Sequence, residues 1–226
     1  QLQVRSTWPA AARAAPAAPA PPSKKKAALV VIDMTVEQLE WCDRGHAEAA
    51  LAATERLIAA APRRFDFAVD ARLWISDPDA TSLTWLHPDV GRAGTAGALL
   101  HPRLARYAAA ATQKGHSPPD RPPCDALVLE HVPKYHYSAF HATELDARLR
   151  ANGIEEVYLA GIHTNFCVAS TAMAAFERGW RCFVVEEACA AFGGEAAHKE
   201  GLAQVERYLG GASVVRMADV LLHVAE

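Results

Sequence analysis

A strand that turns directly into a helix, over residues 157–179, constrains the fold of this chain more than any other feature. Its first four residues are apolar, as in a buried strand, and Gly161 provides a tight turn. The helical pattern begins near Asn165 and stops at Gly179, a residue that readily ends a helix. Cys167 should therefore lie in the first helical turn, at the carboxyl end of a strand. Open α/β sheets hold their reactive groups at such corners.

The position of Cys167 has two interpretations, a reactive thiolate or a structural cysteine. Free N–H groups and the positive end of the helix dipole would lower the pKa of a thiol from about 8.5 and favour the thiolate. The alternative is a buried cysteine that packs as a small hydrophobic side chain. The local sequence leaves both readings open.

Apolar runs alternate with helical patterns along most of the chain. This alternation predicts an α/β fold, a three-layer α/β/α sandwich around a doubly wound, mostly parallel sheet of about six strands. Loops fill the remainder, a long one over residues 71–104 and an excursion over residues 112–125. The expected strands cover residues 27–32, 65–69, 126–129, 154–160, 181–185 and 213–216. The expected helices are one closed by Pro62, one capped by Thr143 and ended by Gly153, and two over residues 195–209 and 218–224.

Composition divides the chain into a tail and one domain. Residues 9–22 hold eight Ala, five Pro and one Arg, which cannot form a packed core. We therefore expect a disordered basic tail over residues 1–25 and a folded domain over residues 26–226. The tail resembles the remnant of an organelle transit peptide, which would place the protein in a plastid or mitochondrion. A plain flexible tail on a cytoplasmic protein is the alternative.

Charge, hydropathy and cysteine content argue against several classes of protein. Residues 1–32 carry a net charge of +5 and the remainder −8, and an acidic body does not suit nucleic acid. No apolar run reaches the length of about 18 residues that a membrane span needs, so we expect a soluble protein. Five cysteines without C-x-x-C spacing argue against a disulfide framework or a zinc knuckle, and favour a reducing compartment.

Three reactive residues follow separate strands. Asp33 ends the first run, Lys134 comes just after the third, and Cys167 follows the fourth. In a doubly wound sheet these ends line one crevice. A carboxylate could take the thiol proton, an ammonium could hold the thiolate, and the thiolate could attack a carbonyl carbon. Singly, each residue also has an ordinary structural role, as a cap, a solvated lysine or a core cysteine.

Three motifs carry a resemblance to a known family. They are ALVVIDM (28–34), KYHYSAF (134–140) and LAGIHTNFCVASTA (159–172). With them the chain resembles the isochorismatase-like cysteine hydrolases, which include nicotinamidases and carbamoylsarcosine amidases, over about residues 27–224. The resemblance implies a small-molecule substrate, no cofactor and a homo-oligomer.

The resemblance also implies residue roles. Asp33, Lys134 and Cys167 would form a catalytic triad that cleaves an amide or related C–N bond through a thioester. A cis peptide bond between Ile162 and His163 would point the N–H of His163, with that of Cys167, at the carbonyl oxygen as an oxyanion hole.

Departures from the family pattern concern metal and substrate. Nicotinamidases carry an Asp-x-His pair after the second strand, whereas this chain has Asp70-Ala71-Arg72. We therefore expect no metal, with a site of Asp70, His87 and His101 as the weaker alternative. The usual aromatic residue after Asp33 is absent, and aromatic side chains from elsewhere could replace it in the substrate pocket. The candidates for this pocket are Trp74, Tyr137 and Phe166, with Trp41 as a further source.

Two functions are compatible with these features. The first is a cysteine-dependent amidase. The second is a catalytically idle family member that serves as a structural or binding subunit, with the basic tail as its docking arm. The intact set of Asp33, Lys134 and Cys167 favours the enzyme.

Overall fold

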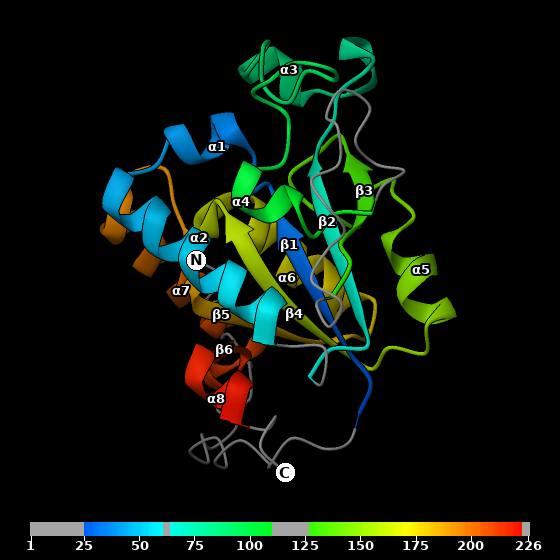
Figure 1. Cartoon of the computed structure of the whole chain (residues 1–226), viewed down its shortest axis with the longest axis vertical. Coiled ribbons are helices and arrows are strands. Elements are labelled where there is room, and N and C mark those ends of the chain that lie inside the picture. The colour runs from blue at the N-terminus through cyan, green and yellow to red at the C-terminus, as the bar shows by residue number, and fades with distance from the viewer. Residues whose placement is uncertain (1–24, 61–63, 110–126, 223–226) are drawn as a thin grey trace, which may run out of the picture.

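Six parallel strands form a single sheet at the centre of the molecule (Figure 1). The computed structural model describes residues 25–60, 64–109 and 127–222. The strand order is β3-β2-β1-β4-β5-β6. The strands are β1 (Ala27–Ile32), β2 (Phe67–Leu73), β3 (Glu130–Lys134), β4 (Glu156–Ile162), β5 (Arg181–Ala190) and β6 (Val214–Val215). The predicted α/β fold class is confirmed.

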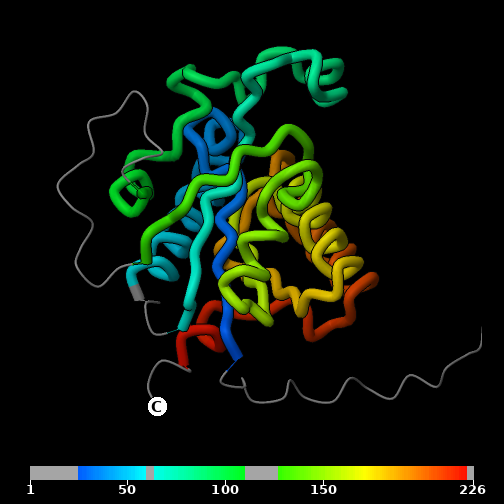
Figure 2. The backbone as a smooth tube through the Cα atoms, turned by 90° about the vertical axis from the view of Figure 1, so that its right-hand side faces the viewer, coloured from blue at the N-terminus to red at the C-terminus, as the bar shows by residue number. Residues whose placement is uncertain are grey.

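Helices cover both faces of this sheet, which makes three layers (Figure 2). One face packs against α2 (Arg44–Ala60) and α8 (Met217–Leu222), and the other against α5 (Leu145–Ala151), α6 (Ala169–Glu177) and α7 (Gly194–Leu209). Shorter helical segments lie in the connections: α1 (Val36–Glu40), η1 (Pro78–Ala80), α3 (Leu83–Leu86), α4 (Pro102–Ala105), η3 (Thr164–Val168) and η4 (Gly211–Ser213). No helix in the described ranges is both long and apolar enough to cross a bilayer.

The central strand β1 shows why an apolar run becomes a buried strand here. Successive side chains of a strand point to opposite faces. Leu29 and Val31 pack into the α2 layer, whereas Val30 and Ile32 pack into the α6 layer. All six residues of β1 are fully buried, as expected for a parallel strand with helices on both faces.

Two strands differ from the sequence prediction. Strand β2 runs past Asp70 to Leu73, because Asp70 forms a buried ion pair with Arg72 on the same face of the strand. Strand β3 covers residues 130–134 rather than 126–129. It is an edge strand, where a proline such as Pro133 is tolerated because one side needs no hydrogen-bond donor.

Other boundaries also shift. Strand β4 includes Gly161, which was expected in a turn, and β5 extends to Ala190 rather than residue 185. The predicted tail, the closure of the second helix at Pro62 and the excursion over residues 112–125 lie outside the described residues.

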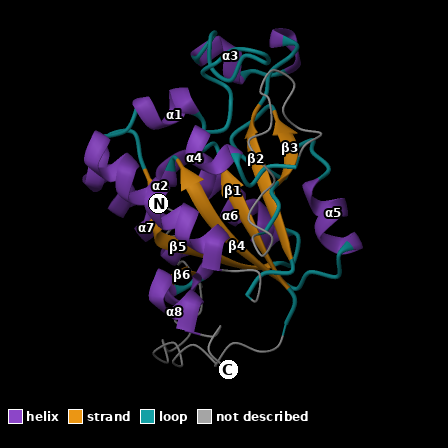
Figure 3. Ribbon diagram, in the orientation of Figure 1, coloured by secondary structure: helices purple, strands orange, loops and turns teal. Residues whose placement is uncertain are grey.

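The strand order places one crevice at the centre of the sheet. From β1 the chain moves outward through β2 to β3, crosses back through α5 to β4, and then continues outward through β5 to β6. The carboxyl ends of β1 and β4 therefore flank the switch point, where open α/β sheets bind ligands. Figure 3 shows α1, α3 and connecting loops above these strand ends.

Candidate active site

Asp33 directly follows β1 and is completely buried. Its backbone is in a left-handed conformation, with φ of 48°, and its N–H donates to the carbonyl of Ala71 at 3.1 Å. The side-chain Oδ1 accepts a hydrogen bond from the N–H of Leu73 at 2.7 Å. Two contacts with the end of β2 thus fix the carboxylate at the switch point.

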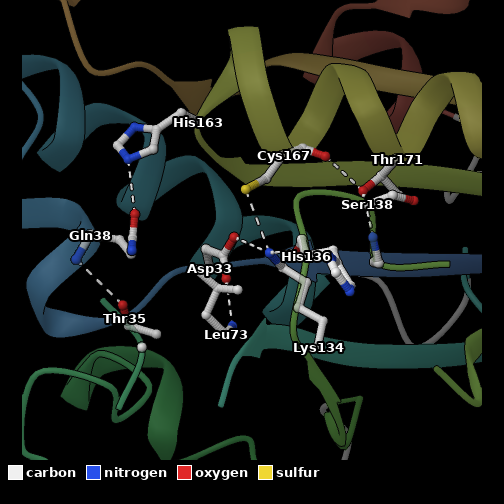
Figure 4. Close-up of polar contacts among 12 residues, drawn as sticks. Asp33, Thr35, Gln38, Leu73, Lys134, His136, Ser138, His163, Cys167 and Thr171 are labelled. Atoms are coloured by element: carbon white, nitrogen blue, oxygen red, sulfur yellow. Dashed lines mark hydrogen bonds and ion pairs between the residues drawn. The ribbon is translucent and has the colours of Figure 1, made fainter. Parts of the chain in front are cut away.

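Lys134 ends β3 and reaches across β2 to the same carboxylate. Its Nζ lies 2.7 Å from Asp33 Oδ2, donates to the carbonyl of His136 at 3.0 Å, and lies 3.5 Å from Cys167 Sγ (Figure 4). Burial by itself would lower the pKa of this ammonium. The charges of Asp33 and Cys167 together outweigh burial, and the pKa of Lys134 is raised above its ordinary value. The lysine is therefore a fixed cation.

Cys167 lies in η3, a single π-helical turn between β4 and α6. The thiol is buried, and burial raises the pKa of Cys167 to about 12, although Lys134 acts in the opposite direction. The expectation of a lowered pKa is thus wrong, because removal from water outweighs the nearby positive charge. Cys167 rests as a neutral thiol beside an Asp33–Lys134 ion pair.

The end of β4 brings the backbone close to β1. Gly161 has φ of 138°, and a Cβ at this position would lie 2.1 Å from the carbonyl oxygen of Ile32. Only glycine fits this contact. The peptide bond between Ile162 and His163, which follows, is cis.

The imidazole of His163 is held by hydrogen bonds on both ring nitrogens. The N–H of Phe192 donates to Nδ1 at 2.9 Å, and Nε2 lies 2.9 Å from Gln38 Oε1. Cys42 Sγ also lies 3.5 Å from Nδ1. Burial lowers the pKa of His163 to about 4, so the ring is neutral at physiological pH.

A pocket of about 360 Å³ opens beside Cys167. Tyr137 and Phe166, two of the predicted pocket residues, line it and stack at a ring distance of 5.6 Å. The pocket wall consists of Gln38, Trp41, Leu73, Leu83, His87, Val90, Tyr137, His163, Phe166, Cys167 and Phe192. Among the described residues that form this wall, none is Lys, Arg, Asp or Glu.

Trp74, the third predicted pocket residue, lies elsewhere. Its ring packs under the guanidinium of Arg72 at 5.3 Å and edge-on to His131 at 5.8 Å. Side chains alternate along β2, so residues 70, 72 and 74 point to one side at the end of this strand. Leu73, which lines the pocket, points to the opposite side. The alternation of β2, which the sequence prediction ended too early, therefore accounts for the difference.

Comparisons with known proteins agree on one family. Residues 115–219 match the model of the Isochorismatase domain. The chain is 27% identical to the crystal structure of nicotinamidase PncA from Bacillus subtilis, with a TM-score of 0.67, over 84% of this chain and 99% of that one. The chain is thus similar to the Isochorismatase family over residues 115–219 and to a nicotinamidase over most of its length.

Further proteins to which this chain is similar carry amidase names. N-carbamoylsarcosine amidase from Thermoplasma acidophilum is 27% identical, with a TM-score of 0.63, over 85% of this chain and 96% of that one. Ureidoacrylate amidohydrolase RutB of Variovorax paradoxus is 40% identical over 84 residues, which are 37% of this chain and 33% of the relative. The chain spans about a third of the length of the curated relatives it matches.

The alternative metal ligands, Asp70, His87 and His101, do not form a cluster. Asp70 is paired with Arg72, His87 lies in the pocket wall, and His101 accepts the N–H of Arg103 at the start of α4. Within the described ranges, no group of three or more His, Cys, Asp or Glu side chains could hold a metal ion.

Sequence reasoning missed several residues of the site. Gln38 and Phe192 fix the His163 ring, and Leu83 and Val90 come from the long loop that follows β2. Of these residues, only Gln38 could have been placed from the sequence. Thr35 is a residue type that caps helices, and it accepts the N–H of Gln38, the third residue of α1. The others depend on loop paths that local patterns do not encode.

Proposed function

We propose that this chain hydrolyses a small amide, or a related C–N bond, through a covalent thioester on Cys167. The observation that carries the proposal is the cluster of Asp33, Lys134 and Cys167, buried together at the switch point and beside an uncharged pocket. The amidase names of the relatives support the same reaction class.

Acylation begins with the neutral thiol. Asp33 takes the proton from Cys167 as Sγ attacks the carbonyl carbon, and Lys134 stabilises the thiolate as it forms. The C=O bond opens to an oxyanion. When the C–N bond breaks, the protonated carboxyl of Asp33 transfers its proton to the departing amine, and the acyl group remains on sulfur as a thioester.

Deacylation reverses these roles. Asp33 takes a proton from a water molecule, and the hydroxide attacks the thioester carbon. The C–S bond then breaks, Cys167 recovers its proton from Asp33, and the carboxylic acid leaves. One water is consumed for each amide, and the enzyme returns to its starting state.

The developing oxyanion needs donors that are already in place. We assign this role to the backbone N–H groups of His163 and Cys167, which lie at the two ends of the β4–η3 corner. The bonds that fix the His163 ring between Phe192 and Gln38 also restrict its backbone.

The alternative of an idle structural subunit rests on the N-terminal tail, which lies outside the described residues, on the unusual stretch after Asp33, and on the altered metal position at Asp70-Ala71-Arg72. A homo-oligomer and a location in a plastid or mitochondrion remain predictions. The buried cluster of Asp33, Lys134 and Cys167 favours the enzyme over the idle subunit.

Ammonia release from a panel of small neutral amides and ureides tests the proposal. The wild-type chain should release ammonia, and Cys167→Ala should reduce kcat by at least about 1,000-fold while the thermal transition is kept. Turnover that survives in Cys167→Ala would discard the covalent mechanism.

A further inference from the structure

Gln38 has an unusual position in the pocket wall, because half of its side-chain amide has no partner. The side chain is 3% exposed and lines the same pocket as Cys167. Its backbone N–H is used in the cap of α1 by Thr35 Oγ1. Its side-chain Nε2 has no hydrogen-bond acceptor among the residues that the structure describes. Native proteins rarely bury a donor in this state.

The orientation of this amide follows from the bonds around His163. A backbone N–H can only donate, so the N–H of Phe192 requires His163 Nδ1 to be an acceptor. In a neutral imidazole the other nitrogen, Nε2, then carries the proton. That proton points to Gln38, and the atom that receives it must be the amide oxygen, Oε1. The amide nitrogen of Gln38, its own Nε2, therefore stands at the end of this chain of hydrogen bonds, and its two N–H groups have no acceptor among the described residues (Figure 4).

The rest of the pocket wall determines which ligand suits this donor. Much of it is apolar or aromatic, including Trp41, Phe166 and Phe192, and it contains no Lys or Arg among the described residues. Lys134 does not line the pocket and is paired with Asp33. A carboxylate in the pocket would lose its hydration without a counter-charge, whereas a neutral acceptor needs only a donor.

We propose that Gln38 determines substrate specificity by donating a hydrogen bond from Nε2 to a second acceptor atom of an uncharged, flat amide. This acceptor would be a heteroaromatic nitrogen or a second carbonyl oxygen, and the scissile carbonyl would lie at Cys167. The inference rests on the proposed function for the position of the scissile group.

Binding to the full chain with Cys167→Ser tests the role of Gln38 without turnover. The probes are benzamide, which has no second acceptor, and the three pyridine carboxamides, which differ from it by one ring nitrogen. Titration calorimetry should give at least one pyridine carboxamide that binds about 3- to 10-fold more tightly than benzamide, the effect of one neutral hydrogen bond.

Gln38→Met removes the donor while nearly keeping the volume of the side chain. In that background the preference, measured as the ratio of the affinities for the pyridine carboxamide and for benzamide, should fall to about 1-fold. Gln204→Met, the same change on α7 away from the pocket wall, is the matched control and should retain the preference. The inference would be overturned if all four probes bound equally to the chain with Gln38 intact, or if none bound. It would also be overturned if the preference survived in Gln38→Met.

A second measurement does not depend on the folding of the Gln38 variant. The side-chain amide protons of Gln38 should shift in ¹H–¹⁵N spectra when the preferred pyridine carboxamide binds, and less with benzamide. Equal shifts with both ligands would count against a hydrogen bond. Failure of the wild-type chain to hydrolyse any amide, together with these binding results, would overturn the proposed function and leave the role of Gln38 in binding intact.

Discussion

A buried ion pair and a buried thiol lie in contact at the centre of this site. Asp33 and Lys134 are both fully buried and 2.7 Å apart, so each charge depends on the other. The thiol of Cys167 is neutral at rest, because burial raises its pKa to about 12. In the proposed reaction, the thiolate therefore forms only when a bound substrate is present and Asp33 accepts the proton.

Replacing Lys134 by Met should affect both stability and thiol reactivity. The change leaves the carboxylate of Asp33 buried without a counter-charge, and we expect the free energy of unfolding to fall by about 3 kcal/mol. Because Lys134 opposes the burial effect on Cys167, its loss should also raise the pKa of the thiol further and slow its alkylation by iodoacetamide. Urea denaturation and peptide mass spectrometry measure the two effects.

A double variant separates charge from packing in that result. Asp33→Asn combined with Lys134→Met removes both charges and should recover at least about half of the lost stability. A double variant that is no more stable than Lys134→Met would show that the ion pair is not the source of the loss.

At the scale of elements, the turn that carries Cys167 depends on its contact with α7. A Cβ on Gly201 of α7 would lie 2.7 Å from the backbone N of Asn165 and 2.8 Å from the carbonyl carbon of Thr164, both in η3. His198, one turn earlier on α7, lies 2.8 Å from Thr164 Oγ1. Helix α7 therefore positions η3, and with it the thiol.

Gly201→Ala should displace this turn. Since backbone atoms cannot move aside as a flexible side chain can, we expect a loss of about 1–3 kcal/mol in stability and a fall in kcat for the preferred amide. Gly211→Ala in η4 is the matched control, because no atom lies within 4 Å of its new Cβ and its φ is not in the left-handed region. It should change stability by less than about 0.5 kcal/mol. Equal effects of the two changes would contradict the role of α7.

Local sequence patterns predict those elements whose side chains agree with their surroundings. Residues 27–32 are uniformly apolar, and β1 has these bounds. Strand β2 could not be read to its end, because Asp70 and Arg72 look like loop residues until their ion pair across one face is known. The extension of β5 includes Glu186 and Glu187, which also look like loop residues in the sequence. In the structure both form ion pairs with Arg216.

The candidate site is predictable in part for a similar reason. Asp33, which directly follows β1, can be placed from the strand alone, because the carboxyl ends of parallel strands lie at one edge of the sheet. Lys134 was placed there less directly, because the predicted strand ended at residue 129 whereas β3 ends at Lys134. The partners of the His163 ring, Gln38 and Phe192, come from separate connections whose meeting depends on tertiary structure.

At the scale of the whole molecule, two buried histidines, His163 and His198, and the half-buried His131 should make the stability depend on pH in the acidic range. Burial lowers the pKa of His163 and His198 to about 4 and that of His131 to about 3. An unfolded histidine has a pKa of about 6.5 and binds protons more readily. The stabilising contribution is therefore complete above about pH 6.5 and is lost as the pH falls from there towards 4.

We expect the midpoint temperature of thermal unfolding to stay constant above pH 7 and to fall steeply as the pH is lowered from about 6 to 4. His198→Asn keeps an acceptor near Thr164 but removes one titrating group, so its midpoint should fall less steeply over the same range. His46→Asn is a contrasting change on the ring that packs edge-on to His198 at 4.7 Å. A wild-type midpoint that does not change between pH 7 and 4 would contradict the assignment of buried neutral histidines.

The central claim, that Cys167 carries the acyl group, is tested most directly by trapping that group. The full chain is mixed with p-nitrophenyl acetate, a small neutral acyl donor, quenched with acid, digested and read by peptide mass spectrometry. The account predicts an acetyl group on the peptide with Cys167, formed together with a burst of p-nitrophenol, and neither in Cys167→Ala. A burst that persists in Cys167→Ala, or an acetyl group found only on other residues, would contradict it.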